Sequence, residues 1–371
     1  MLRNCKKQEG IMTPRLIAWL CALATSALSA TGATAQTSPA KIATKPATSA
    51  VARGPDGKPD LQGFWDFRTL TPLERPLNQG TKAFLTEEEA KAVSQQTANR
   101  RAQAAAPSAT RTEPREPGGG AAAVGGYNDF WLDFGVNVVG DRRTSLIVDP
   151  PDGRLPTRQK DVPYQSGSLL ADMPAQYPMR VLSTGAAADG PESRGLAERC
   201  LVGFNSGPPM LPSGYNNHMQ LVQTRDYVVI LNEMNHDARI IPIGPRPLLP
   251  GNVRQWAGVS RGYWEGDTLV VKTTNFTDKT PSFAPSVVTS IGTGVTLNLT
   301  ERLRRADANT LVYEFTIDDP TTFTRPFTVS IPMHRSNEPV YEYACHEGNY
   351  GLMSIVRGAR ALEADQGSTE R

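Results

Sequence analysis

The chain has 371 residues, of which 20% are charged and 39% hydrophobic, and its formal net charge is +2 at pH 7. Charges this evenly balanced give no electrostatic reason to expect nucleic acid or an anionic membrane surface as a partner. Beyond the N-terminal residues, no stretch is long and apolar enough to span a bilayer.

The chain begins with the pattern of a secretory signal peptide. Arg15 precedes a short apolar run, residues 16–24, and small residues follow it. The start codon is either Met1 or Met12. Removing residues 1–35 takes away four basic residues and one acidic residue, which leaves a formal charge of −1. We therefore expect a periplasmic or extracellular protein.

Removal of that segment leaves two cysteines, Cys200 and Cys345. In an oxidising compartment, two cysteines favour a disulfide over two free thiols. Closing so long a loop would stabilise the fold by about 4–5 kcal/mol in the chain-entropy model.

The N-terminal half alternates between ordered and disordered segments. Residues 36–58 predict a disordered linker, and the aromatic-rich residues 60–67 predict a short strand. A capping box that opens at Thr86 predicts a helix to about residue 101. Residues 104–126, rich in Ala, Pro and Gly, predict a disordered insertion.

The middle of the chain is mostly irregular. Residues 143–149 predict a strand that ends at the turn signal of residues 150–153. Residues 154–217 predict long loops with one short helix at 192–201. A loop region this long usually wraps a scaffold or carries function.

The C-terminal portion predicts the core of a mainly β fold. Eight strands are expected, at residues 221–223, 227–233, 238–243, 255–264, 268–276, 295–304, 310–317 and 327–333. Short connections favour an antiparallel up-and-down meander that forms a barrel or a strongly curved sheet. One β-rich domain is expected over residues 59–365, with a tail at 366–371.

Period-2 alternation supports the strands. One face of residues 295–304 is expected to carry Val295, Leu297, Leu299 and Leu303. Residues 311–318 alternate in the same way. Asn349 is predicted to cap a C-terminal amphipathic helix, whose apolar side chains are Leu352, Ile355, Val356, Ala359 and Leu362.

Several motifs carry a resemblance. The segments are residues 127–131, 143–150, 262–271 and the terminal YEYACHEGN, residues 341–349. Together they resemble a family of secreted, mostly uncharacterised bacterial proteins over nearly the whole mature chain. This resemblance implies one evolved unit and no particular reaction.

A shorter resemblance concerns the G-x-W spelling of lipocalin-like barrels. It occurs at Gly63-Phe64-Trp65 and again at Gly262-Tyr263-Trp264. This resemblance favours a barrel over a sandwich.

The mature chain has four histidines, and these are the expected proton carriers near neutral pH. His236 is followed by Asp237, which suggests a general base oriented by a carboxylate, or else a turn. His346 and Glu347 follow Cys345, so a disulfide would fix them as a pocket wall or serve only as a staple.

Nearby polar residues are candidates for substrate binding. Arg239 suits an anionic group or developing negative charge, and Asn216, Asn217 and Tyr343 suit hydroxyls or carbonyls. Metal-binding spacings, serine-nucleophile elbows and nucleotide-binding loops are all missing from the sequence. We therefore predict no metal and no cofactor, and the alternative is zinc held by His236, His346, Glu347 and His218 if the fold brings them together.

The leading hypothesis is a secreted β-barrel enzyme of hydrolase or lyase type. It would act by His/carboxylate acid–base chemistry on a small apolar or aromatic molecule. The alternative is a non-catalytic periplasmic barrel that binds such a ligand. Convergence of His236 and His346 in one cleft would favour the enzyme.

Overall fold

The computed structural model describes residues 51–105, 132–166, 179, 190–247 and 249–369. Residues 48–371 group into one compact unit, which is the unit described below. The predicted signal peptide, most of the linker at 36–58, nearly all of the insertion at 104–126 and the motif at 127–131 lie outside the described residues.

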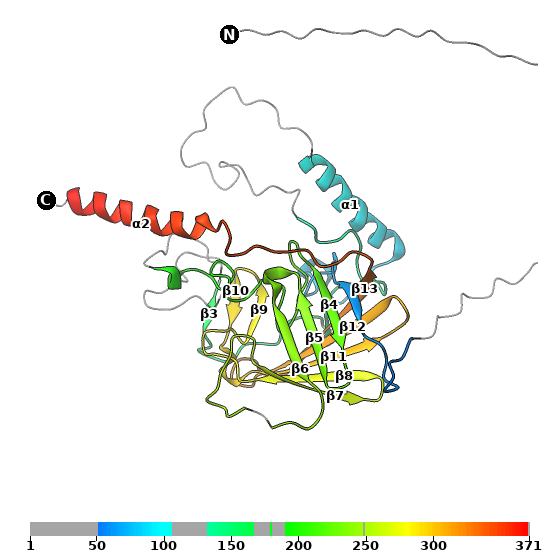
Figure 1. Cartoon of the computed structure of the whole chain (residues 1–371). Coiled ribbons are helices and arrows are strands. Elements are labelled where there is room, and N and C mark those ends of the chain that lie inside the picture. The colour runs from blue at the N-terminus through cyan, green and yellow to red at the C-terminus, as the bar shows by residue number, and fades with distance from the viewer. Residues whose placement is uncertain (1–50, 106–131, 167–178, 180–189, 248, 370–371) are drawn as a thin grey trace, which may run out of the picture. The chain divides into compact units, whose positions relative to one another are not determined.

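The fold is mainly antiparallel β, as the sequence predicts. Ten strands form the main sheet of the described part: β1 (Gly63–Asp66), β2 (Ile147–Asp149), β4 (His218–Gln223), β5 (Tyr227–Asn232), β6 (Ala238–Pro242), β7 (Val259–Glu265), β8 (Thr268–Thr274), β11 (Asn298–Arg305), β12 (Thr310–Asp318) and β13 (Phe327–Ser336). Figure 1 shows these strands with the helices α1 and α2.

The strand order departs from a simple meander. Along the main path it is β6-β5-β4-β1-β13-β12-β11-β8-β7, and β2 pairs with β13 beside this path. The N-terminal strand β1 is therefore inserted between β4 and β13, which sequence neighbourhood alone does not predict. A second sheet joins β3 (Tyr164–Gln165), β10 (Thr289–Ile291) and β9 (Phe283–Ser286).

The two ends of the strand path, β6 and β7, touch at one place. An isolated parallel bridge pairs Ile243 with Gly262, and the Gly244 N–H donates to the Gly262 carbonyl at 2.9 Å. This single bridge is not a continuous ladder, so the strands of the described residues do not form a closed barrel.

Alternation along the strands is confirmed in β12. Leu311, Tyr313, Phe315 and Ile317 are all completely buried. The prediction for Val295 is wrong, since this residue lies in the 3-10 helix η6 (Gly294–Thr296) and is 37% exposed. The Thr293 side chain accepts the Val295 N–H and turns the chain before β11 begins.

Of the two α-helices described, one lies between β1 and β2 in sequence and the other follows β13. α1 (Glu87–Ala105) has the predicted capping box, in which the Thr86 N–H donates to Glu89 Oε2 and the Glu89 N–H to Thr86 Oγ1. α2 (Tyr350–Thr369) is capped by Asn349, whose Oδ1 accepts the Leu352 N–H at 3.4 Å.

The short helices within the described residues are of the 3-10 type: η1 (Leu77–Gln79), η4 (Pro191–Ser193), η5 (Met234–His236) and η6. The helix expected at 192–201 is thus reduced to η4. The predicted disulfide is confirmed, because Cys200 and Cys345 are bonded. Among the described helices, none has the length and apolarity to cross a membrane.

Candidate functional site

A row of titratable side chains crosses three neighbouring strands of the main sheet. In the register, Asp66 of β1 faces His218 of β4 on one side and His334 of β13 on the other. Directly opposed residues share a face, with Cβ atoms about 4.5–5.5 Å apart. The sheet therefore aligns a carboxylate between two imidazoles.

The neighbours of this row explain why it faces outward. Trp65, Met219 and Met333 lie next to the three residues in sequence, and each is completely buried. Because successive side chains of a strand point to opposite faces, burial of these three places Asp66, His218 and His334 on the other face.

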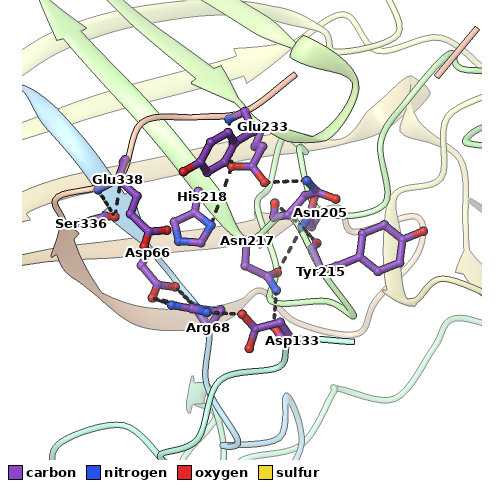
Figure 2. A network of polar contacts seen from close by, with 12 residues as sticks. Asp66, Arg68, Asp133, Asn205, Tyr215, Asn217, His218, Glu233, Ser336 and Glu338 are labelled. Carbon is purple, nitrogen blue, oxygen red and sulfur yellow. Dashed lines mark hydrogen bonds and ion pairs between the residues drawn. The ribbon is translucent and has the colours of Figure 1, made fainter. Parts of the chain in front are cut away.

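Arg68 holds the Asp66 carboxylate in place. Arg68 Nε donates to Asp66 Oδ1 at 3.0 Å and to Oδ2 at 2.9 Å, and Nη2 donates to Oδ2 at 2.6 Å. Arg68 Nη1 also bonds Asp133, so the guanidinium links two carboxylates, as Figure 2 shows. The hydrogen bond to Asp66 is the main cause of a raised pKa for Arg68.

Asp133 is held by two arginines. Arg101 Nη2 lies 3.3 Å from Asp133 Oδ1, on the side away from the Arg68 contact. Burial raises the pKa of the Asp133 carboxyl, but the hydrogen bond and charge of Arg68 outweigh burial, and the net pKa is lowered. Asp133 therefore stays ionised as a fixed negative charge.

Glu233 adds a second carboxylate beside His218. It follows β5 directly and is buried, and its Oε2 lies 3.9 Å from His218 Nδ1. Its Oε1 accepts from Asn216 Nδ2 at 2.5 Å, and its Oε2 accepts the Tyr341 N–H at 3.4 Å. Carboxylates and imidazoles thus alternate from Glu233 through His218 and Asp66 to His334.

A cavity of about 690 Å³ opens beside this row. Its polar lining consists of Asp66, Arg68, Thr69, Arg101, Asp133, Asn137 and His334, and its apolar lining includes Leu132, Val136, Val138, Val139 and Pro332. The volume lies within the usual range for small-molecule sites. Two guanidiniums balance two carboxylates, so the lining has no excess charge.

The predicted pair His236 and Asp237 lies next to this network but points elsewhere. Nε2 of the exposed His236 accepts the Tyr343 N–H at 2.8 Å. Asp237 Oδ2 accepts from Ser206 Oγ at 2.6 Å and from the Gly203 N–H at 3.4 Å. Burial is the main cause of a raised pKa for Asp237. The structure therefore directs this carboxylate at the loop 203–206 and the imidazole at the C-terminal segment.

The other predicted residues fall into two places. Asn216 donates to Glu233, and Asn217, which is 1% exposed, belongs to the network of Figure 2. Its Oδ1 accepts the Ser213 N–H at 2.7 Å and its Nδ2 donates to the Asp133 carbonyl at 3.1 Å. Both asparagines therefore position protein groups.

Tyr343 and Glu347 line a second cavity of about 340 Å³. His346 is exposed and lies three residues beyond the Tyr343 N–H that His236 accepts. The C-terminal segment thus lies beside His236, although neither His236 nor His346 lines either of these cavities.

Arg239, which the sequence predicts to bind an anionic group, forms an ion pair inside the protein. It belongs to β6, where it is largely buried, and its Nη2 donates to Oε2 of Glu301 at 2.8 Å. Glu301 also accepts from the Tyr313 hydroxyl at 2.8 Å. The arginine expected to hold substrate charge is instead part of a buried ion pair.

Asp66 and Glu233 are not among the site residues predicted from the sequence, and His218 and His334 are predicted only as two of the four possible proton carriers, with His218 also an alternative zinc ligand. The available signal was that Asp66, His218 and His334 each adjoin a large apolar residue at a strand end. Only strand order shows that these ends come together.

Comparison with protein-family models, curated proteins and solved structures finds no match to this chain. Within the described residues, no three His, Cys, Asp or Glu side chains are grouped so as to hold a metal ion. The fold and the site define an antiparallel β protein with an imidazole–carboxylate row beside a mixed polar and apolar cavity.

Proposed function

We propose that this protein is an acid–base enzyme of hydrolase or lyase type whose centre is the row His334, Asp66, His218 and Glu233. The observation that carries the proposal is the register that sets Asp66 between two histidines. Histidine is the side chain best suited to exchange protons near neutral pH, and such groups typically contribute about 10²–10⁴-fold to a rate.

Each residue of the row has a distinct role. His334 is exposed and lines the cavity, so it is the group that takes a proton from the substrate or gives one to it. Asp66, oriented by Arg68, stabilises the imidazolium that forms. His218 and Glu233 provide a second imidazole–carboxylate pair that exchanges the proton with the opposite side of Asp66.

The substrate is a small, uncharged, apolar or aromatic molecule. The arginines of the cavity are already paired with carboxylates, so the lining gives no reason for a charged substrate to be preferred. The aliphatic wall, which includes Leu132 and Val136, would desolvate an apolar group beside His334.

A strongly curved sheet is part of the proposal. Arg239 of β6 reaches Glu301 of β11 at 2.8 Å, although these strands are six places apart in the sheet order. In a flat sheet six strand spacings would separate them by about 29 Å. The bridge between Ile243 and Gly262 supports the same curvature, and a lipocalin-like closed barrel would be its limit.

Secretion is also proposed, on the basis of the N-terminal pattern and the disulfide. A disulfide between Cys200 and Cys345 is typical of an oxidising compartment. We also propose that the chain belongs to the family of secreted bacterial proteins that its YEYACHEGN motif, residues 341–349, resembles. Mass measurement of the protein exported by a bacterial host would show a new N-terminus near residue 36 if the signal peptide is real.

The activity can be tested by incubating the mature protein with a metabolite extract and measuring consumed and formed species by mass spectrometry. On the substrate found, His334→Ala is expected to lower kcat by about 10²–10⁴-fold. His346→Ala is the matched control, because its imidazole is exposed and outside both cavities, and it should keep full activity.

The opposite result would place the chemistry elsewhere. If His334→Ala and His218→Ala fold and retain activity while His236→Ala or His346→Ala loses it, the centre assigned here is wrong. A compound that binds in the cavity of about 690 Å³ without being transformed would support the alternative, a ligand-binding protein.

A further inference from the structure

A second cavity, of about 340 Å³, lies between the C-terminal segment 343–352 and the loop 194–204. Its lining is Arg194, Ala197, Glu198, Phe204, Tyr215, Tyr343, Ala344, Cys345, Glu347, Gly348, Asn349, Gly351, Leu352 and Ile355. It shares no lining residue with the cavity beside His334. A role for it is therefore independent of the proposed catalytic row.

Covalent and hydrogen bonds hold the two walls of this cavity together. The disulfide joins Cys345 in one wall to Cys200 beside the other. Asn349 Nδ2 donates to the Glu198 carbonyl at 3.1 Å, and the Tyr343 N–H donates to His236. A cavity fixed at these points is pre-organised, which lowers the entropy lost when a ligand binds.

Three aromatic side chains, all half-buried, line the cavity: Phe204, Tyr215 and Tyr343. Phe204 and Tyr215 form a T-shaped pair with ring centroids 5.0 Å apart. Figure 2 shows that the Tyr215 ring points away from His218 and the Asp66 row. In a T-shaped pair the two rings are turned at about a right angle, so they offer a ligand different surfaces.

The charged lining is negative on balance. Glu198 and Glu347 contribute two carboxylates, and Arg194 contributes one guanidinium. Arg194 forms an ion pair with Glu198, because its Nη2 donates to Glu198 Oε1 at 2.8 Å. The other oxygen of Glu198 accepts the Gly195 N–H at 2.6 Å. One negative charge, that of Glu347, therefore remains uncompensated within the lining.

We propose that this second cavity binds a small organic cation, an ammonium compound with apolar substituents. Aromatic faces attract cations through their quadrupoles, and quaternary ammonium groups are recognised in this way by aromatic cages. The Glu347 carboxylate adds a direct Coulomb attraction.

A neutral polyhydroxylated ligand such as a sugar suits the lining less well. A sugar needs several free polar groups to orient its hydroxyls. The polar groups of Glu198 and Asn349 are already engaged, because Asn349 also accepts the Leu352 N–H. Charge and aromatic side chains dominate the lining of this cavity.

Choline and its neutral isostere 3,3-dimethylbutanol form a sharp pair of probes. Both are titrated into the mature, disulfide-bonded protein at low salt, with calorimetry and NMR shifts as readouts. Choline is expected to bind at least about tenfold more tightly, because only choline gains the cation–π and Coulomb contributions. A sugar mixture is the third probe.

Two variants test the assignment. Glu347→Gln, at an exposed position, should weaken choline binding several-fold and leave the isostere unchanged. Tyr343→Leu should also weaken choline binding, because it removes one aromatic ring of the lining. Glu363→Gln on α2 is the matched control, since it removes one exposed carboxylate outside the cavity, and it should change nothing.

The inference is overturned if neither probe binds, if choline and the isostere bind equally, or if the sugars bind in their place. It is also overturned if Glu363→Gln weakens choline binding as much as Glu347→Gln, which would indicate a general charge effect. Circular dichroism of each variant confirms that the fold is intact.

Discussion

Asp237 lies at the C-terminal end of the η5 turn, where its backbone N–H donates to the Met234 carbonyl. Its carboxylate is half-buried and is bonded to Ser206 and Gly203. Adjacency in sequence to His236 suggested an orienting contact, but the η5 turn, in which His236 has φ +51°, separates the two side chains. A local turn thus decides which partner each residue finds.

The raised pKa of Asp237 makes folding stability depend on pH. Because the folded state binds this proton more tightly than the unfolded chain, the contribution is full below the unfolded pKa and is lost as pH rises through the folded pKa. Asp237→Asn should therefore gain stability relative to the native protein as pH increases. Denaturant midpoints at pH 3.5 and pH 7 measure this.

The matched control is Asp226→Asn, an exposed carboxylate between β4 and β5. Its stability difference from the native protein should be nearly the same at both pH values. If the stability difference between Asp237→Asn and the native protein is also the same at both pH values, burial does not raise the pKa of Asp237.

At the scale of elements, the alternation in β11 predicts which face is buried but does not predict that a charged residue lies on that face. Leu299 and Leu303 are buried as predicted, and Glu301 lies between them on the same face with 0% exposure. Its partners are Arg239 of β6 and Tyr313 of β12. Burial, together with the charge of Glu301, keeps the pKa of Tyr313 well above its ordinary value. A charged residue on the dry face is tolerated because it is paired.

This ion pair predicts an asymmetric response to mutation. Glu301→Ala should cost about 3–5 kcal/mol in the free energy of unfolding, because it leaves the Arg239 guanidinium buried without a counter-charge. The double variant Arg239→Met, Glu301→Leu should recover most of that loss. Urea unfolding of Arg239→Met, Glu301→Leu and their double variant measures the coupling. Additive losses would contradict a direct pair.

On the scale of the whole molecule, the disulfide connects parts of the chain that are 145 residues apart. It ties the segment after β13, and with it α2, to the loop that precedes β4. The apolar side chains of α2 contribute little to the core, since Leu362 is 63% exposed. The bond and the contacts of Tyr341, Tyr343 and Asn349 therefore hold this region in place.

Removing the bond should weaken the whole fold. The variant Cys200→Ser, Cys345→Ser is expected to lose up to about 5 kcal/mol of unfolding free energy, the chain-entropy value for a loop of this length. A reductant should lower the stability of the native protein toward that of the variant and leave the variant itself unchanged. A native protein insensitive to reductant would contradict the prediction.

Much of the secondary structure follows from sequence. Period-2 alternation predicts β12 and most of β11, because each strand buries the side chains of one face and exposes those of the other to solvent. The capping box of Thr86 and Glu89 predicts the start of α1, since its hydrogen bonds are local. The disulfide follows from the cysteine number together with the predicted compartment. These features depend on nearest neighbours or on composition alone.

Strand order and the candidate site depend on contacts between distant segments. Residues near 66, 218, 233 and 334 come together only because β1 inserts between β4 and β13, and no local pattern encodes that insertion. The same applies to Arg239, whose partner Glu301 is 62 residues away. The chain by itself determined which residues are apolar, capped or paired by sulfur. Tertiary packing alone decided which polar residues meet, because side chains far apart in sequence become neighbours only when the sheet assembles.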